Sequence, residues 1–255
     1  LYIYEYVESR DTPQNSWSTW EFPDFMTIRA IRMINNEISV AVTSGPQGAT
    51  RITVLRMRVY DRPGHSGYEI FLDARLQYDD VGQEVILPDD YPLDDSLLVV
   101  QGDNCPEPYS SVNYTRDDRT LSLEYDMFGG TVWAGYRFES SYIPAIQYIR
   151  DDSNKVQTTS KLRITDFLIS LTGAELSADI ISPHYDFDTQ DWEGKIYGDI
   201  RTRTDTPTVI RDRWRVSYKQ PNTTSDLRLH TQSYLPVTVH QIEWRGTYNK
   251  AGRRF

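Results

Sequence analysis

Alternation of apolar and polar residues recurs along this chain and constrains its fold more than any other feature of the sequence. A period of two residues is typical of a strand that buries one face, and no comparable stretch holds the period of 3.6 that a helix needs. The sequence therefore predicts an all-β fold of antiparallel sheets, in a sandwich or propeller architecture. The clearest runs are Ile38 to Val42, Leu121 to Tyr125, Val132 to Phe138, Leu176 to Ile180 and Trp214 to Tyr218, where Arg213, Arg215, Ser217 and Lys219 face the other way.

Three predicted strands change their apolar face partway. The apolar parity switches between Val54 and Leu55, between Ile164 and Phe167, and between Val239 and Ile242. A β-bulge, or burial on both faces of the sheet, would account for each switch.

Loop composition divides the chain. Proline and aspartate gather between Pro88 and Pro108, which we interpret as one long surface excursion. The polar run DDSNKVQTTS, residues 151–160, marks a predicted boundary between a domain of residues 1–150, which contains the acidic loop, and a domain of residues 151–255. Because Leu1 stands inside an alternation of tyrosines, we expect the chain to be a piece of a longer polypeptide.

The charge of the chain is acidic, with 27 Lys and Arg against 37 Asp and Glu and a formal net charge of −10. Such a field repels phosphates, so nucleic acid is not expected to be gripped, although it can slide past without adhering. No run of about 18 apolar residues occurs, so no membrane span is expected. Cys105 alone forms no internal disulfide, and the four histidines are too scattered for a zinc site: His65, His184, His230 and His240.

The densest carboxylate cluster does not follow a known metal-binding register. In YDFDTQDWEG the acidic residues and Gly194 are out of step with a calcium loop, so a solvated loop is the favoured interpretation. Two carboxylates of a cleft could instead hydrolyse glycosides, which leaves an enzymatic alternative open. The clusters are Asp186, Asp188, Asp191 and Glu193 here, and Asp89, Asp90, Asp94 and Asp95 earlier in the chain.

Motifs for nucleophilic or cofactor chemistry are absent from the sequence. No G-x-S-x-G elbow or phosphate-binding glycine loop occurs, and the acidic surroundings of Cys105 disfavour its thiolate. We therefore assign no catalytic, cofactor-binding or metal residues and no cofactor. Trp17, Trp20 and Trp192 could stack on sugars, but packing in a core or interface is the more frequent use of indoles.

Several segments, in their order, resemble the tail tubular protein B family, the tail nozzle of short-tailed bacteriophages. The resemblance covers nearly the whole chain and ends in a Glu-Trp-x-Gly-x-Tyr signature at Glu243, Trp244, Gly246 and Tyr248. We expect Trp244 to fill a core beside Leu235 and Val237, and Gly246 to permit a close backbone approach. The segments are YEYVESRDTPQNSWSTWEFP, ISVAVTSGPQGATRITVLRMRVYD, LDARLQYDD, VILPDDYPLDDSLLVVQGD, TVWAGYRFESSYIPAIQYIRDD, KLRITDFLISLTGAELSADI and SYLPVTVHQIEWRGTYNKAGRRF.

The resemblance implies the C-terminal portion of a structural, non-enzymatic protein of the phage tail. Propeller-like strands would be followed by a sandwich-like terminal region. Family members form a ring, a hexamer, below the tail adaptor ring; it carries fibre proteins, and DNA is ejected through its bore. The expected location is the tail of the virion, assembled in the host cytoplasm. A glycan-binding module of the tail, or a tail-associated glycan hydrolase, is the alternative.

Overall fold

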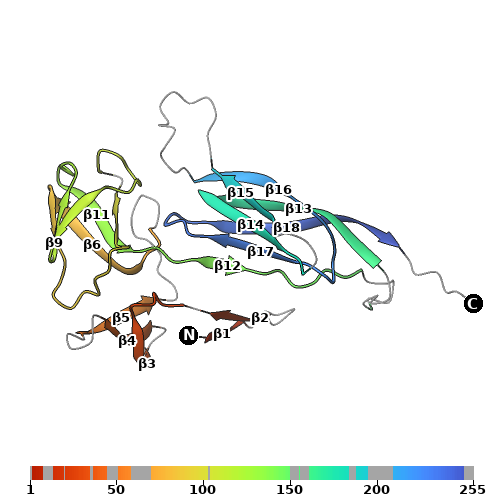
Figure 1. The fold of residues 1–255 in the computed structure, drawn as a ribbon, viewed down its shortest axis with the longest axis horizontal. Coiled ribbons are helices and arrows are strands. Elements are labelled where there is room, and N and C mark those ends of the chain that lie inside the picture. The colour runs from red at the N-terminus through yellow and green to blue at the C-terminus, as the bar shows by residue number, and fades with distance from the viewer. Residues whose placement is uncertain are drawn as a thin grey trace, which may run out of the picture. The chain divides into compact units, whose positions relative to one another are not determined.

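The computed structural model describes residues 2–7, 14–19, 21–34, 37–44, 51–58, 70–102, 104–149, 155, 161–183, 188–194 and 209–249. These residues form strands and turns without a helix, in antiparallel sheets (Figure 1). The all-β prediction is confirmed. The chain divides into two compact units. The first contains Leu1–Pro63, Ile86–Leu97 and Asp117–Thr120, and the second contains Gly64–Val85, Leu98–Arg116 and Leu121–Phe255.

The first unit contains two sheets. Strands β1 (Tyr2–Val7) and β2 (Gln14–Thr19) pair with each other, and β3 (Thr27–Ile34), β4 (Glu37–Ser44) and β5 (Arg51–Arg58) form a sheet of that order. Ile38, Val40 and Val42 of β4 are buried on one face, as their alternation predicts.

The second unit begins with a small sheet and ends with a sandwich. In the small sheet β11 (Gly130–Tyr136) lies between β6 (Asp73–Val81) and β8 (Leu98–Gln101). A further sheet has the order β7 (Glu84–Ile86), β10 (Thr120–Leu123), β9 (Tyr114–Asp117). Leu97, Val99 and Val100 are buried, so the predicted surface excursion between Pro88 and Pro108 is wrong where this apolar run forms β8.

The sandwich packs a four-stranded sheet against a three-stranded one. The first has the order β12 (Ser140–Tyr142), β17 (Asp226–Thr231), β14 (Glu175–Ile181), β15 (Asp188–Glu193), and the second β16 (Ile210–Pro221), β13 (Lys161–Gly173), β18 (Thr238–Asn249). Their inner faces share one core, which includes Phe167, Ile169, Ala178, Val216 and Leu229. Burial of this apolar area is the main force that holds the two sheets together.

A second core cluster lies within the same unit and centres on Tyr234. Tyr234 packs with Ile70, Val100 and Leu235, its hydroxyl donates to the Tyr109 carbonyl oxygen at 3.0 Å, and the Phe71 amide donates to its carbonyl oxygen at 2.8 Å. These contacts connect the segment between β17 and the last strand of the sandwich with the residues that precede β6 and follow β8.

Two of the three predicted face changes are β-bulges. The register of β13 shifts between Ile164 and Asp166 against both neighbouring strands, and β18 shifts where Ser170 and Leu171 of β13 meet it. The change in β5 has a different cause, because its register against β4 is continuous and Ile52 is 67% exposed. The side chains of Ile52 and Val54 remain exposed on β5, which is an edge strand of its sheet.

The terminal sandwich is the expected architecture, whereas the described strands do not close a propeller. The boundary between residues 150 and 151 stays a prediction.

Candidate functional site

One buried guanidinium fixes a turn of the predicted acidic loop and lies beside Asp89. Arg119 is 9% exposed and donates to the carbonyl oxygens of Pro88 and, at 3.3 Å, of Tyr91. Its Nε atom lies 3.8 Å from the Oδ1 atom of Asp89, whose side chain is fully exposed. The Leu87 amide donates to the Arg119 carbonyl oxygen at 2.9 Å. One arginine thus fixes the turn that presents the acids.

The same loop is fixed at two further points. The Oδ1 atom of Asp94 accepts hydrogen bonds from the Ser96 amide at 2.9 Å and hydroxyl at 2.7 Å, and the Thr53 hydroxyl donates to the Asp90 carbonyl oxygen. Asp117 and Asp118 immediately precede Arg119 and are exposed. Two neighbouring stretches of the first unit therefore carry exposed or partly exposed aspartates, and we call them the acidic loop pair. The first stretch contains Asp89, Asp90, Asp94 and Asp95, and the second contains Asp117 and Asp118.

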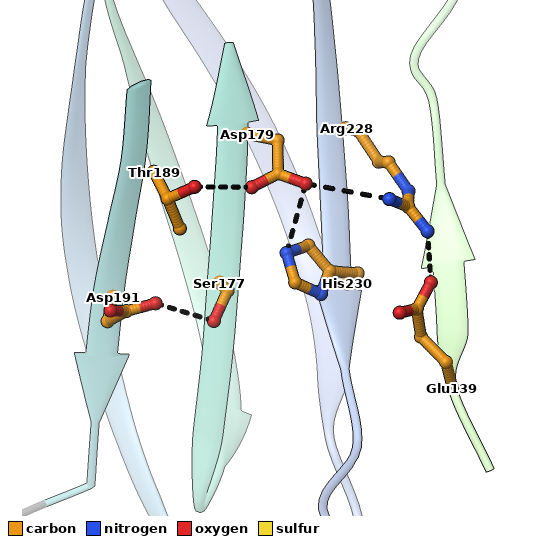
Figure 2. Close-up of polar contacts among 7 residues, drawn as sticks. All are labelled: Glu139, Ser177, Asp179, Thr189, Asp191, Arg228 and His230. Carbon is orange, nitrogen blue, oxygen red and sulfur yellow. Dashed lines mark hydrogen bonds and ion pairs between the residues drawn. The ribbon is translucent and has the colours of Figure 1, made fainter. Parts of the chain in front are cut away.

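A second polar cluster lies on the outward face of the four-stranded sheet (Figure 2). Asp179 of β14 is 2% exposed, and its Oδ1 atom accepts a hydrogen bond from the Thr189 hydroxyl of β15 at 2.9 Å. Its Oδ2 atom lies 3.1 Å from His230 Nε2 and 3.6 Å from Arg228 Nη1, both on β17. Arg228 also pairs with Glu139, which precedes β12.

The Asp179 carboxylate thus links β14 with β15 and β17, and Arg228 extends the link to the segment before β12. The Nε2 atom of His230 does not meet the geometry of a hydrogen bond to Asp179. The contact is therefore an ion pair, formed when the imidazole is protonated. A Ser-His-Asp relay would need a serine hydroxyl bonded to the imidazole. Ser177, opposite His230 in the ladder, instead donates to Asp191 at 2.7 Å. The geometry therefore supports cross-strand stabilisation rather than nucleophilic attack.

Sequence reasoning missed this cluster. The available signal was the outward parity of Ser177 and Asp179 on one strand and of Arg228 and His230 on another. Their partnership depends on the pairing of β14 with β17, which no local pattern of the sequence reports.

The later carboxylate cluster is spread along β15. Asp188 and Asp191 are exposed on opposite sides of the strand, Glu193 is exposed, and Asp186 lies outside the described residues. Trp192 is 8% exposed and its Nε1 donates to Asp212 at 3.0 Å, so its indole offers no face for stacking on sugars. No group of three or more His, Cys, Asp or Glu suited to a metal ion occurs in the part of the chain that the structure describes.

The remaining candidates occupy ordinary structural positions. Cys105 is buried, and its thiol donates to the Thr131 carbonyl oxygen at 3.2 Å. Trp244 packs against the sandwich core with Val237, as expected, whereas Leu235 belongs to the second cluster. Trp17 lies in β2, and Trp20, His65 and His184 lie outside the described residues.

Gly246 permits a close approach of two backbones, as predicted. A Cβ atom there would overlap the Arg163 carbonyl oxygen and lie 3.1 Å from Ile164 Cα. His240, on the outward face of the three-stranded sheet, contacts the Thr172 hydroxyl at 2.8 Å.

One isolated carboxyl has a perturbed acidity. Burial raises the pKa of Asp73 from 3.8 to about 6.

The family model described as bacteriophage nozzle protein matches residues 1–255, and no curated protein matches the chain significantly. Among the described residues, no helix has the length and apolarity to cross a membrane.

Proposed function

The chain belongs to the bacteriophage nozzle protein family and is a structural component of the phage tail, and from this premise we propose that it forms part of the ring through which DNA is ejected. In this proposal several copies, six by the family pattern, close into a tube. The tube attaches to the tail adaptor ring and carries fibre proteins, and it is assembled in the host cytoplasm.

The observation that carries the proposal is the family match, which extends over residues 1–255. Two physical features are consistent with it. The sandwich core is continuous and its outward face is linked across strands by the Asp179 cluster, which suits a wall that must keep its shape. The net charge of −10 suits a channel, since phosphate repulsion prevents DNA from adhering to the wall.

The acidic loop pair is the candidate surface of this assembly. We propose that some of its aspartates face the bore or a seam between subunits. The motivation is that Arg119 fixes the turn at Pro88 and Tyr91, between which Asp89 and Asp90 are exposed. A ring structure with all six carboxylates on the outer wall would refute this assignment.

The first test is the mass and symmetry of the assembled particle. The full-length protein, expressed or taken from virions, is examined by mass photometry and negative-stain electron microscopy. Six-fold rings with a central channel are the expected result. A monomer that persists at every concentration, with the adaptor protein present, would refute the proposal.

A further inference from the structure

The outward face of the three-stranded sheet carries a row of arginines in an otherwise acidic chain. Phe167, Ile169 and Leu171 of β13 are buried in the sandwich core, so the alternate residues of this sheet point outward. We define the arginine face by six of the charged residues on this side of the sheet: Arg211, Arg213 and Arg215 of β16, Asp166 of β13, and Glu243 and Arg245 of β18.

The strand register places these residues on one surface. Arg211, Arg213 and Arg215 lie opposite Thr172, Ser170 and Leu168, and Arg245 lies opposite Asp166. Successive outward residues of one strand are about 6.8 Å apart, and neighbouring strands about 4.8 Å. The guanidinium groups therefore cover a compact area rather than a scattered surface.

Internal ion pairs neutralise only part of this charge. Arg213 contacts Glu243 at 2.9 Å and Arg215 contacts Asp166 at 2.8 Å. Arg211 and Arg245 are exposed, and neither forms an ion pair with another residue that the structure describes. Within these six residues, four arginines against two carboxylates leave an excess of two positive charges.

One polar atom of the face also lacks a partner. Asp166 is 3% exposed, yet its Oδ1 atom has no hydrogen-bond partner among the described residues. A buried carboxylate oxygen without a donor is costly. Because this atom is itself buried, a docked donor would satisfy it once the exposed side chain of Arg215, which pairs with the other oxygen, moves aside. The face thus carries both an unbalanced charge and an unfilled hydrogen-bonding position.

A ring requires two different complementary surfaces on each copy. Contacts around a closed ring are heterologous, so one patch of a subunit meets a different patch of its neighbour. This chain carries a positive patch, the arginine face, and a negative patch, the acidic loop pair. Charge complementarity selects register and suppresses wrong partners at such interfaces.

We infer that the arginine face docks against the acidic loop pair of a second copy of this chain. The inference rests on the proposed ring and assigns its seam. Carboxylates of the neighbour pair with Arg211 and Arg245, while the internal pairs keep Arg213 and Arg215 in place. Duplex DNA is the other polyanion that could meet arginines, but four arginines within a chain of net charge −10 provide a small positive area inside a repulsive field.

The test reverses charge on the full-length protein. The Arg211→Glu, Arg245→Glu variant should need roughly a hundredfold higher concentration for half-assembly of rings, because like charges then oppose each other across the seam. The Arg32→Glu, Arg56→Glu variant is the matched control. It makes the same change of net charge at two exposed arginines of the β3-β4-β5 sheet, and it should assemble like the wild type.

A compensating variant excludes loss of folding as the explanation. Adding Asp90→Lys and Asp95→Lys to the Arg211→Glu, Arg245→Glu variant should restore assembly to within about tenfold of the wild type. If the wild type forms rings and the Arg211→Glu, Arg245→Glu variant assembles equally well, the proposed seam is refuted but the proposed ring is not. Loss of duplex binding with normal assembly would also overturn it, in favour of DNA. Absence of rings in the wild type would refute the proposed function itself.

Discussion

At the scale of single residues, Arg119 shows how an acidic surface keeps its shape. Its buried guanidinium donates to two carbonyl oxygens of the loop, and the Tyr91 amide also donates to one of them, that of Pro88, at 3.0 Å. Arg119→Met keeps the aliphatic volume but removes both of these charged hydrogen bonds and the contact with Asp89. We expect a loss of about 3 kcal/mol in the free energy of unfolding.

Urea denaturation measures this loss, and amide hydrogen exchange should quicken at residues 88–95. The control is Arg32→Met at an exposed arginine of the same unit, with a change within about 0.5 kcal/mol. Equal stability of the two variants would show that the loop does not depend on Arg119.

The titration of Asp73 should change the stability of the protein with pH in the direction opposite to that of most carboxylates. Because burial raises its pKa from 3.8 to about 6, the folded state binds the proton more tightly than the unfolded chain. Its contribution to stability is present below about pH 4 and is lost as pH rises through about 6. Asp73→Asn removes the ionisation and should stabilise the protein by about 2 kcal/mol at pH 7, with little gain at pH 4.

Urea unfolding of the wild type and of Asp73→Asn at both pH values checks this expectation. The exposed Asp80→Asn serves as control, with the same difference from wild type at each pH. A gain for Asp73→Asn that does not change with pH would contradict the titration of Asp73.

At the scale of elements, the sequence predicted strands well where one face is buried in a core. The alternations of Ile38, Leu176 and Val216 coincide with strands whose apolar residues are buried. Periodicity failed for Ile52, because exposure on an edge strand depends on which segment covers it. It failed for the Asp179 cluster because that contact joins strands far apart in sequence, and hydrogen bonding across strands leaves no local signal.

The bulge of β13 supplies a prediction at this scale. Gly246 of β18 lies opposite Ile164, beside the register shift, with backbone atoms where a Cβ would stand. Gly246→Ala should cost about 2 kcal/mol, since neither backbone atom can retreat without breaking the ladder. Thermal denaturation measures the cost.

Gly82→Ala is the matched control, because the nearest atom to its added Cβ is 3.9 Å away. If Gly246→Ala and Gly82→Ala have the same melting temperature, β18 can shift, and the close approach does not constrain its register.

At the scale of the whole molecule, the uneven distribution of charge matters more than its sum. A chain of net charge −10 repels its own copies at long range, so assembly needs local attraction strong enough to offset that repulsion. The arginine face and the acidic loop pair provide such an attraction in the proposed seam. An apolar seam would instead depend on buried area, and the two cases respond oppositely to salt.

Salt dependence of assembly therefore separates an electrostatic seam from an apolar one. Between 0.1 and 1 M NaCl the Debye length falls from about 10 to about 3 Å, which screens exposed charge pairs. We expect the concentration for half-assembly of wild-type rings to rise about tenfold over this range, measured by mass photometry. Arg211→Gln, Arg245→Gln should assemble more weakly at low salt and respond less to added NaCl, whereas Arg32→Gln, Arg56→Gln should follow the wild type. Rings that become more stable as salt is added would instead indicate an apolar seam. Salt does not weaken apolar burial, and it screens the repulsion between the negatively charged copies.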